Sequence, residues 1–118
     1  MSLTINTGTD ELLCLIDDRV ATITLNRPGK RNALSDRLTP ALRRILLELD
    51  TRQDVGCIVI TGAGSAFCAG GDISGMGAVG GDPSALEPTI QERTRALQHK
   101  HDTLTHRLFD HSKPTIAA

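Results

Sequence analysis

The chain has 118 residues, a formal net charge of −1, two Phe and no Trp or Tyr. A near-neutral chain without these stacking platforms lacks the footprint of a nucleic-acid binder, so we expect no nucleic-acid partner. No segment approaches the roughly 20 apolar residues that span a bilayer, and residues 1–4 do not resemble a secretory signal, so we expect no membrane partner. Three cysteines without a CxxC spacing indicate reduced thiols and a cytoplasmic location.

Two apolar runs near the start of the chain predict a β-hairpin. Residues 12–16 and 20–25 are rich in aliphatic and β-branched side chains, and the polar segment 17–19 separates them. In the second run, Val and Thr alternate with the set Ala21, Ile23 and Leu25. Because side chains on a strand alternate between its faces, we expect one face of this hairpin to be buried.

A loop, a helix and a third strand are expected next. Pro, Gly and Asn over residues 26–32 predict the loop. Ser35 is expected to cap a helix whose Leu and Ile residues recur at helical spacing to about Asp50. Residues 57–60 are apolar and β-branched, which predicts a strand buried on both faces. The order strand, strand, helix, strand predicts an α/β fold.

The third strand leads into a loop of small residues. Ala69, Gly70 and Gly71 allow the main chain to approach a ligand closely, and Asp72 favours the start of a helix. A backbone N–H held in such a place can donate to a carbonyl oxygen that becomes negative during a reaction, an interaction worth about 3 kcal/mol. The pattern predicts a ligand site at this loop.

The last third of the chain predicts a mobile segment and then a second helix. The glycine-rich residues 75–81 are expected to be mobile, and prolines at 83 and 88 argue against regular structure before about Thr89. The helix must end before Pro114. Its apolar stripe consists of Ile90, Leu97, Leu104 and Leu108.

Several single features allow a second interpretation. Cys68, beside a helix start, is either a structural thiol or an activated nucleophile. The sequence Gly-Ala-Gly at 62–64, with Asp82 about 20 positions on, resembles the opening of a dinucleotide-binding fingerprint, but Phe67 stands where the third glycine belongs.

Two groups of polar side chains also allow two interpretations each. His99, Asp102 and His106 share a helical face as metal ligands or, as we expect, as solvated side chains, so no metal site is predicted. Glu87 and Glu92 are either exposed or within reach of a ligand as acid or base.

Four segments together resemble the crotonase superfamily, the enoyl-CoA hydratase and isomerase proteins. Residues 66–73 (AFCAGGDI) are similar to its signature loop. Residues 20–28 (VATITLNRP), followed by 32–34 (NAL), resemble the first hairpin strand of that family and the loop at its acyl-CoA site. Residues 54–62 (DVGCIVITG) and 113–118 (KPTIAA) resemble the strands before the signature loop and after the next helix.

The resemblance implies an incomplete crotonase-like α/β spiral of ββα turns. Residues 1–118 would form the N-terminal portion of a single domain, and the second oxyanion donor and the acid/base carboxylates would lie beyond Ala118. A fragment, one half of a cleaved enzyme and a natively short protein are all compatible with this. We expect the apolar faces of Ile58, Ile60 and Ile116 to be partly uncovered, and family members usually assemble as trimers or as hexamers made of two trimers.

The same resemblance implies a function and a set of site residues. The amide of Gly71 would be catalytic, holding the thioester oxygen of an acyl-CoA and stabilising its enolate as one half of an oxyanion hole. Ala33, with Lys30 nearby, would border the nucleotide and pantetheine, while Arg27 and Lys30 suit phosphate contact, although Arg27 also suits capping of a strand end. The implied substrate-binding residues are Arg27, Lys30, Ala33, Ala69, Gly71, Asp72 and Ile73.

No separate cofactor is expected, because coenzyme A is part of the substrate. The alternatives are a non-catalytic acyl-CoA-binding or assembly module and an unrelated α/β domain.

Overall fold

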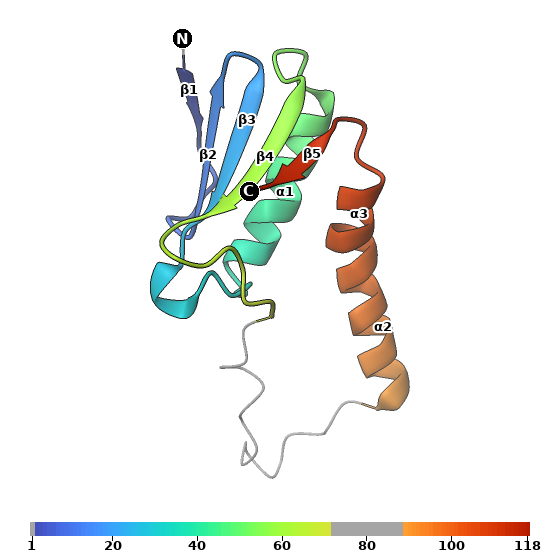
Figure 1. Ribbon diagram of the computed structural model, residues 1–118. Coiled ribbons are helices and arrows are strands. Elements are labelled where there is room, and N and C mark those ends of the chain that lie inside the picture. The colour runs from blue at the N-terminus through green and yellow to red at the C-terminus, as the bar shows by residue number, and fades with distance from the viewer. Residues whose placement is uncertain (1, 72–88) are drawn as a thin grey trace.

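A computed structural model describes residues 2–71 and 89–118 (Figure 1). Its core is a five-stranded sheet in the order β1-β2-β3-β4-β5. The first three strands pair antiparallel, and β3, β4 and β5 pair parallel. The helix start expected at Asp72, the site residue Ile73 and the mobile segment expected at residues 75–81 lie outside the described residues.

The elements follow the predicted order with one additional strand at the start. They are β1 (Ser2–Ile5), β2 (Leu12–Asp17), β3 (Val20–Leu25), the 3-10 helix η1 (Pro28–Lys30), α1 (Leu38–Thr51), β4 (Cys57–Gly62), α2 (Ile90–Lys100), the π-helical turn η3 (His101–Thr105), α3 (His106–Phe109) and β5 (Thr115–Ala117).

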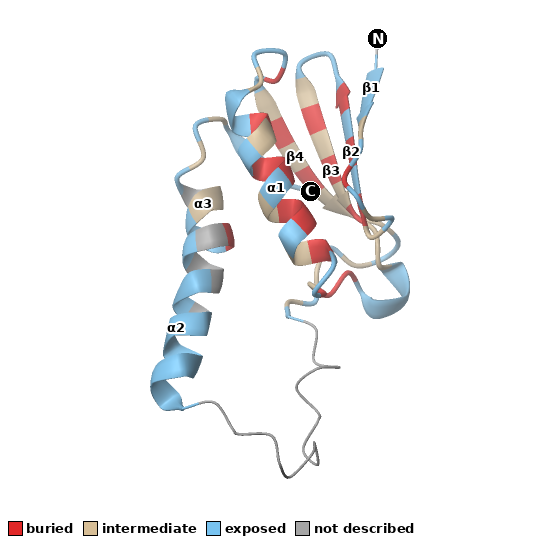
Figure 2. Ribbon diagram, turned by 180° about the vertical axis from the view of Figure 1, so that it is seen from behind, coloured by how far each residue is buried: buried red, intermediate tan, exposed pale blue. Residues whose placement is uncertain are grey.

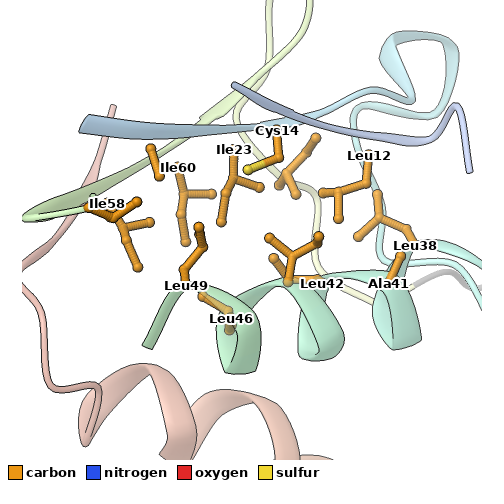
Figure 3. Packing of buried hydrophobic residues seen from close by; sticks show 14 of the residues in the cluster. Leu12, Cys14, Ile23, Leu38, Ala41, Leu42, Leu46, Leu49, Ile58 and Ile60 are labelled. Atoms are coloured by element: carbon orange, nitrogen blue, oxygen red, sulfur yellow. The ribbon is translucent and has the colours of Figure 1, made fainter. Parts of the chain in front are cut away.

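The hydrophobic core lies between one face of the sheet and α1 (Figure 3). Alternation predicted this face correctly: Ala21, Ile23 and Leu25 are buried, and the side chains between them are only half-buried. Strand register places Cys14, Ile23 and Ile60 in one row across three strands. The helix contributes Leu38, Ala41, Leu42, Ile45, Leu46 and Leu49 to the same cluster.

Two burial expectations for β4 are wrong. The strand is not buried on both faces, because Cys57 and Val59 on the face away from α1 are only half-buried. Ile58 and Ile60 are not left uncovered, since they lie under α1 and are buried. Ile116 on β5 is 52% exposed, as expected, because its register partner Val59 lies on the face of the sheet away from α1.

Ser35 caps α1 as predicted, although the regular helix begins three residues later. Its Oγ accepts hydrogen bonds from the backbone N–H of Leu38 at 3.0 Å and of Arg37 at 3.3 Å. The same hydroxyl donates to Glu11 Oε1 at 2.7 Å. An N-cap bond of this kind satisfies amides that the helix itself leaves without partners.

The segment between α3 and β5 closes the other end of α1. The buried side chain of His111 contacts the carbonyl oxygen of Leu46 through Nε2 at 3.0 Å. Lys113 Nζ donates to the carbonyls of Leu49 and Arg52. The Ser112 hydroxyl donates to Asp50 and holds the pKa of that carboxyl below its usual value. The bonds from Lys113 supply donors at the C-terminus of the helix, where carbonyls lack partners within the helix.

The predicted second helix begins where expected but is not uniform. Thr89 and Glu92 form a capping box, each side chain accepting the other's backbone N–H at 3.1 Å. The two ends of the predicted stripe differ in burial: Leu104 is 8% exposed and Ile90 is 82% exposed. Figure 2 shows that α2 is exposed along most of its length, whereas α3 is partly buried. Among the helices of residues 2–71 and 89–118, none has the length and apolar character needed to cross a membrane.

Truncation of Leu46 tests the contact between α1 and the sheet. Leu46 is fully buried, so Leu46→Ala should lower the free energy of unfolding by about 3 kcal/mol through lost burial and a residual cavity. Leu47 is 47% exposed and is the matched control; Leu47→Ala should cost less than about 1 kcal/mol. Urea denaturation followed by circular dichroism measures both. Equal losses would contradict the assigned helix face.

The three thiols should differ in reactivity. Burial raises the pKa of the Cys14 thiol to about 11, with the Glu48 carboxylate adding to the shift, whereas Cys57 and Cys68 are only half-buried. At pH 8, a thiol-specific disulfide reagent should modify two cysteines quickly and Cys14 only after unfolding in urea, because the thiolate is the reactive form. Cys14→Ser should remove the slow phase alone. A fast reaction at Cys14 in the folded protein would contradict its burial.

Candidate functional site

Two loops leave the same edge of the sheet, where the parallel strands β3 and β4 end. We call residues 26–35 the first loop and residues 63–71 the second loop. Asn32 joins them, because its Nδ2 donates to the carbonyls of Ala63 at 2.9 Å and Ala66 at 2.8 Å. Its Oδ1 accepts the backbone N–H of Arg27 at 2.8 Å. The side chain is fully buried, so these bonds have no competition from water.

The last residue of β4 has to be glycine in this arrangement. A Cβ built on Gly62 would stand 2.3 Å from the carbonyl oxygen of Phe67 and 2.7 Å from Asn32 Nδ2. Atoms do not approach so closely, so any side chain here would push the second loop away from Asn32. The close contact of strand and loop therefore depends on the missing Cβ.

Further along, the two loops are joined by their backbones. The N–H of Leu34 donates to the carbonyl of Gly70 at 2.7 Å in a parallel bridge between Leu34 and Gly71. Gly70 has a φ of 95°, a left-handed conformation that favours glycine. Gly71 is exposed, and within the described part of the chain its N–H has no hydrogen-bond acceptor. The bridge therefore fixes the position of Gly71 at the end of the second loop.

Arg27 lies inside the first loop and is already paired. Its Nε is 2.8 Å from Glu11 Oε1, and its Nη1 donates to the carbonyl of Ala33 at 2.6 Å. Since Glu11 also accepts from Ser35, this carboxylate ties the first loop to the start of α1. The contacts give Arg27 a role in holding the loop, and phosphate contact by Arg27 stays a prediction.

The other expected site residues occupy different environments. Lys30 is exposed at the end of η1, and Ala33, whose N–H donates to the carbonyl of Lys30, is buried. Ala69 is exposed on the second loop, on the way to Gly71. Asp72 and Ile73 fall outside the described residues. The structure thus brings Ala33 and Gly71 together through the Leu34 bridge.

A cavity of about 580 Å³ adjoins Gly71, between α1 and the helical segment that contains η3. Leu34 and Gly71 line its side at the loops, and Leu104 lines its side at η3. Arg43 of α1 and His99 of α2 are polar residues of its wall. The cavity is the space next to the exposed amide into which part of a ligand could extend.

The structure also bears on the alternative interpretations of Cys68, Glu92 and the Gly-Ala-Gly sequence at 62–64. Cys68 packs against the core, and its Sγ accepts the N–H of Gly70 at 3.4 Å, so it supports the loop. Glu92 is occupied by the capping box of α2. No helix begins within residues 63–71, which a dinucleotide fingerprint would require, so that interpretation is wrong.

The metal interpretation can be tested only in the described residues. His106 pairs there with Asp110 at 2.8 Å, and no three metal-binding side chains gather anywhere in residues 2–71 and 89–118. Glu87 and Asp82 lie outside the described residues.

Sequence reasoning missed the role of Asn32. An Asn in a loop between Arg and Ala looks like an ordinary turn residue, and turn residues are normally exposed. Asn32 has a φ of 58°, which Asn tolerates better than most residues, and its side chain is fully buried. Nothing in the local sequence distinguishes a buried Asn from an exposed one, because its partners are 31 and 34 residues away.

Comparison with known proteins places this architecture in one structural class, the α/β fold of the solved enoyl-CoA hydratases. The crystal structure of an enoyl-CoA hydratase from Mycobacterium smegmatis superposes with a TM-score of 0.74 at 32% identity, over 92% of this chain and 39% of that one. A sequence model described as enoyl-CoA hydratase/isomerase matches residues 16–118. The chain belongs to the enoyl-CoA hydratase/isomerase family.

Two curated relatives show how far the similarity extends. The probable enoyl-CoA hydratase EchA14 of Mycobacterium tuberculosis is 45% identical over 81 residues, which are 69% of this chain and 31% of that protein. The 1,2-epoxyphenylacetyl-CoA isomerase of Escherichia coli is 30% identical over 107 residues, covering 91% of this chain and 38% of that protein. The chain spans about a third of the length of these relatives.

Replacement of Asn32 tests the link between the loops. Asn32→Ala leaves the carbonyls of Ala63 and Ala66 and the N–H of Arg27 without their partner, so we expect a loss of about 3 kcal/mol in unfolding free energy. Asn26→Ala is the control, because Asn26 Nδ2 makes a single exposed bond to the carbonyl of Asp10; it should cost about 1 kcal/mol or less. Urea denaturation compares the two. If Asn32→Ala were as mild as the control, the loops would not depend on this side chain.

Proposed function

We propose that the chain binds an acyl-CoA thioester and stabilises its enolate through the backbone N–H of Gly71, as one half of an oxyanion hole. The observation that carries this proposal is the state of that amide. It lies at a fixed place in the parallel bridge with Leu34, it is exposed, and it has no acceptor among the described residues. A donor held in advance stabilises developing negative charge without the cost of reorganisation.

The chemistry asks for a donor that acts most strongly in the transition state. Removal of a proton next to a thioester carbonyl moves negative charge onto the carbonyl oxygen. A preorganised N–H contributes about 3 kcal/mol to the stabilisation of such an oxygen, and more of that contribution is realised as the charge grows. In this proposal a second donor and the acid/base groups come from a family-length protein of which residues 1–118 are the N-terminal portion.

The rest of the ligand is assigned by the surroundings of Gly71. The acyl chain enters the cavity lined by Leu34 and Leu104, whose apolar side chains suit methylene groups. Coenzyme A lies along the first loop, with Lys30 exposed near its phosphates and Ala33 behind the pantetheine. Arg27, already paired with Glu11, holds this loop in place. No further cofactor is required.

A second candidate is an acyl-CoA-binding module without catalysis. It is favoured by the exposure of Asp36, the one carboxylate among the described residues that line the cavity, since an exposed group is not held ready for proton transfer. Detection of hydration, isomerisation or proton exchange by the family-length protein would exclude it. Proton exchange at the carbon next to the thioester, followed by NMR in D₂O, is the most general of these assays.

Association into trimers or hexamers in the cytoplasm is part of the proposal. It is supported by the uncovered face of the sheet, where Leu13 and Leu15 of β2 and Ile116 of β5 are all more than 40% exposed. Apolar side chains gathered on one face are typical of a surface that another chain covers.

Gly71→Pro tests the proposed donor, because proline has no N–H. Binding of acetoacetyl-CoA, whose enolate form can be followed by its absorbance, should weaken at least tenfold in the variant, which corresponds to about 1.4 kcal/mol. Gly71→Ala is the matched control: it keeps the N–H, and a Cβ at this position meets nothing within 4 Å.

The control should bind as tightly as the unchanged protein. Equal affinity of the proline variant, with unfolding curves that show it is folded, would rule out Gly71 as the donor. Weak binding by the alanine variant as well would point to a steric effect in place of a lost hydrogen bond.

A further inference from the structure

The cavity beside Gly71 has a mixed wall. Leu34, Pro40, Ala96 and Leu104 are apolar, Thr39, His99 and Thr105 are polar, and Arg43 of α1 contributes a permanent positive charge. Asp36 also borders the cavity, but it is exposed to solvent, and water screens its charge. A chain of methylene groups that starts at Gly71 would therefore pass apolar side chains and come within the field of a guanidinium.

Arg43 differs from the adjacent Arg44 because no charged group of the described residues pairs with it. Its Nε is shielded from solvent and has no hydrogen-bond partner. Neither a carboxylate nor a carbonyl of the described residues pairs with the guanidinium. The adjacent Arg44, in contrast, donates to the carbonyl of Asn6 and lies 3.8 Å from Glu48. An arginine N–H withdrawn from water without an acceptor is costly, so an acceptor from outside the chain would recover that cost.

A second arginine, Arg107, has a shielded Nε as well, but it stands among more carboxylates than Arg43 does. The Nε of Arg107 also lacks a hydrogen-bond partner, but Arg107 lines a different cavity together with Asp50, Asp102 and Asp110. Three carboxylates border that cavity, although they are exposed as Asp36 is. Among the described residues that line the cavity beside Gly71, Asp36 is the one carboxylate.

We infer that Arg43 makes the cavity selective for acyl groups that end in a carboxylate, so that the substrates are coenzyme A thioesters of dicarboxylic acids. The inference rests on the proposed function, because it needs the thioester oxygen at Gly71 and the acyl chain in the cavity. Guanidinium and carboxylate match in charge and in their paired hydrogen-bonding atoms. The apolar residues of the wall, such as Leu34 and Leu104, suit the methylene groups that separate thioester and carboxylate.

The test compares two thioesters of equal chain length, glutaryl-CoA and pentanoyl-CoA, which differ in the terminal carboxylate. Isothermal titration calorimetry gives the dissociation constant of each for the full chain. We expect glutaryl-CoA to bind about tenfold more tightly, since a hydrogen bond to a charged group contributes about 1.5 kcal/mol or more. The preference should shrink as the salt concentration rises.

Variants assign the preference to one side chain. Arg43→Met keeps the length and apolar stem of the side chain, and it should reduce the preference to less than about twofold without weakening pentanoyl-CoA binding. Arg43→Lys should retain part of the preference, because it keeps the charge without the planar fork. Arg44→Met is the control and should keep the full preference, since Arg44 lies at a different cavity.

Each outcome decides a different statement. Equal binding of the two thioesters by the unchanged protein, or a preference that survives in Arg43→Met, would overturn the role of Arg43 and leave acyl-CoA binding intact. Failure of both thioesters to bind would overturn the proposed function and this inference with it. If Arg43→Met does not fold, the comparison of the two thioesters with the unchanged protein still decides the matter.

Discussion

Backbone groups at the end of two parallel strands need partners, and the carboxamide of Asn32 supplies them. Beyond β3 and β4 the chain leaves the sheet, so the carbonyls of Ala63 and Ala66 lose the ladder that would otherwise bond them. One buried side chain satisfies both and receives the N–H of Arg27 in return. The bridge that fixes Gly71 lies farther along the same loops, so the position of the exposed amide depends on a residue that no substrate would touch.

Helix α1 connects the core to the site because some of its residues pack in the core and others line the cavity beside Gly71. Leu38, Leu42 and Leu46 lie on the face that packs in the core. Arg43, next to Leu42 in sequence, lines the cavity. Bonds at both ends hold the helix in place, from Ser35 at its start and from the segment 111–113 at its end. Rigid support of this kind is what a cavity needs if it is to distinguish ligands by the position of one charge.

Sequence patterns predicted the elements that carry their own periodicity. The bounds of β3 were correct because alternation along a strand reports its buried face, and Ser35 was recognisable as a cap by residue type and position. Strand β1 was missed because Ser2–Ile5 becomes a strand only through its pairing with β2. The burial of β4 on both faces was wrong, since an apolar run does not reveal whether one layer or two cover it. Asn32 acquires its role from partners 31 and 34 residues away, which no local pattern contains.

The mixed pairing of the sheet has a consequence for the order of folding. Strands β1, β2 and β3 are close in sequence and pair early, whereas Ile58 of β4 has to wait for Thr115 of β5. Contacts between distant residues form slowly because a long loop must close first. During synthesis one edge of β4 therefore stays open until the chain has been made as far as β5. An open strand edge attracts other strands, so this edge is where association between unfinished chains competes with folding.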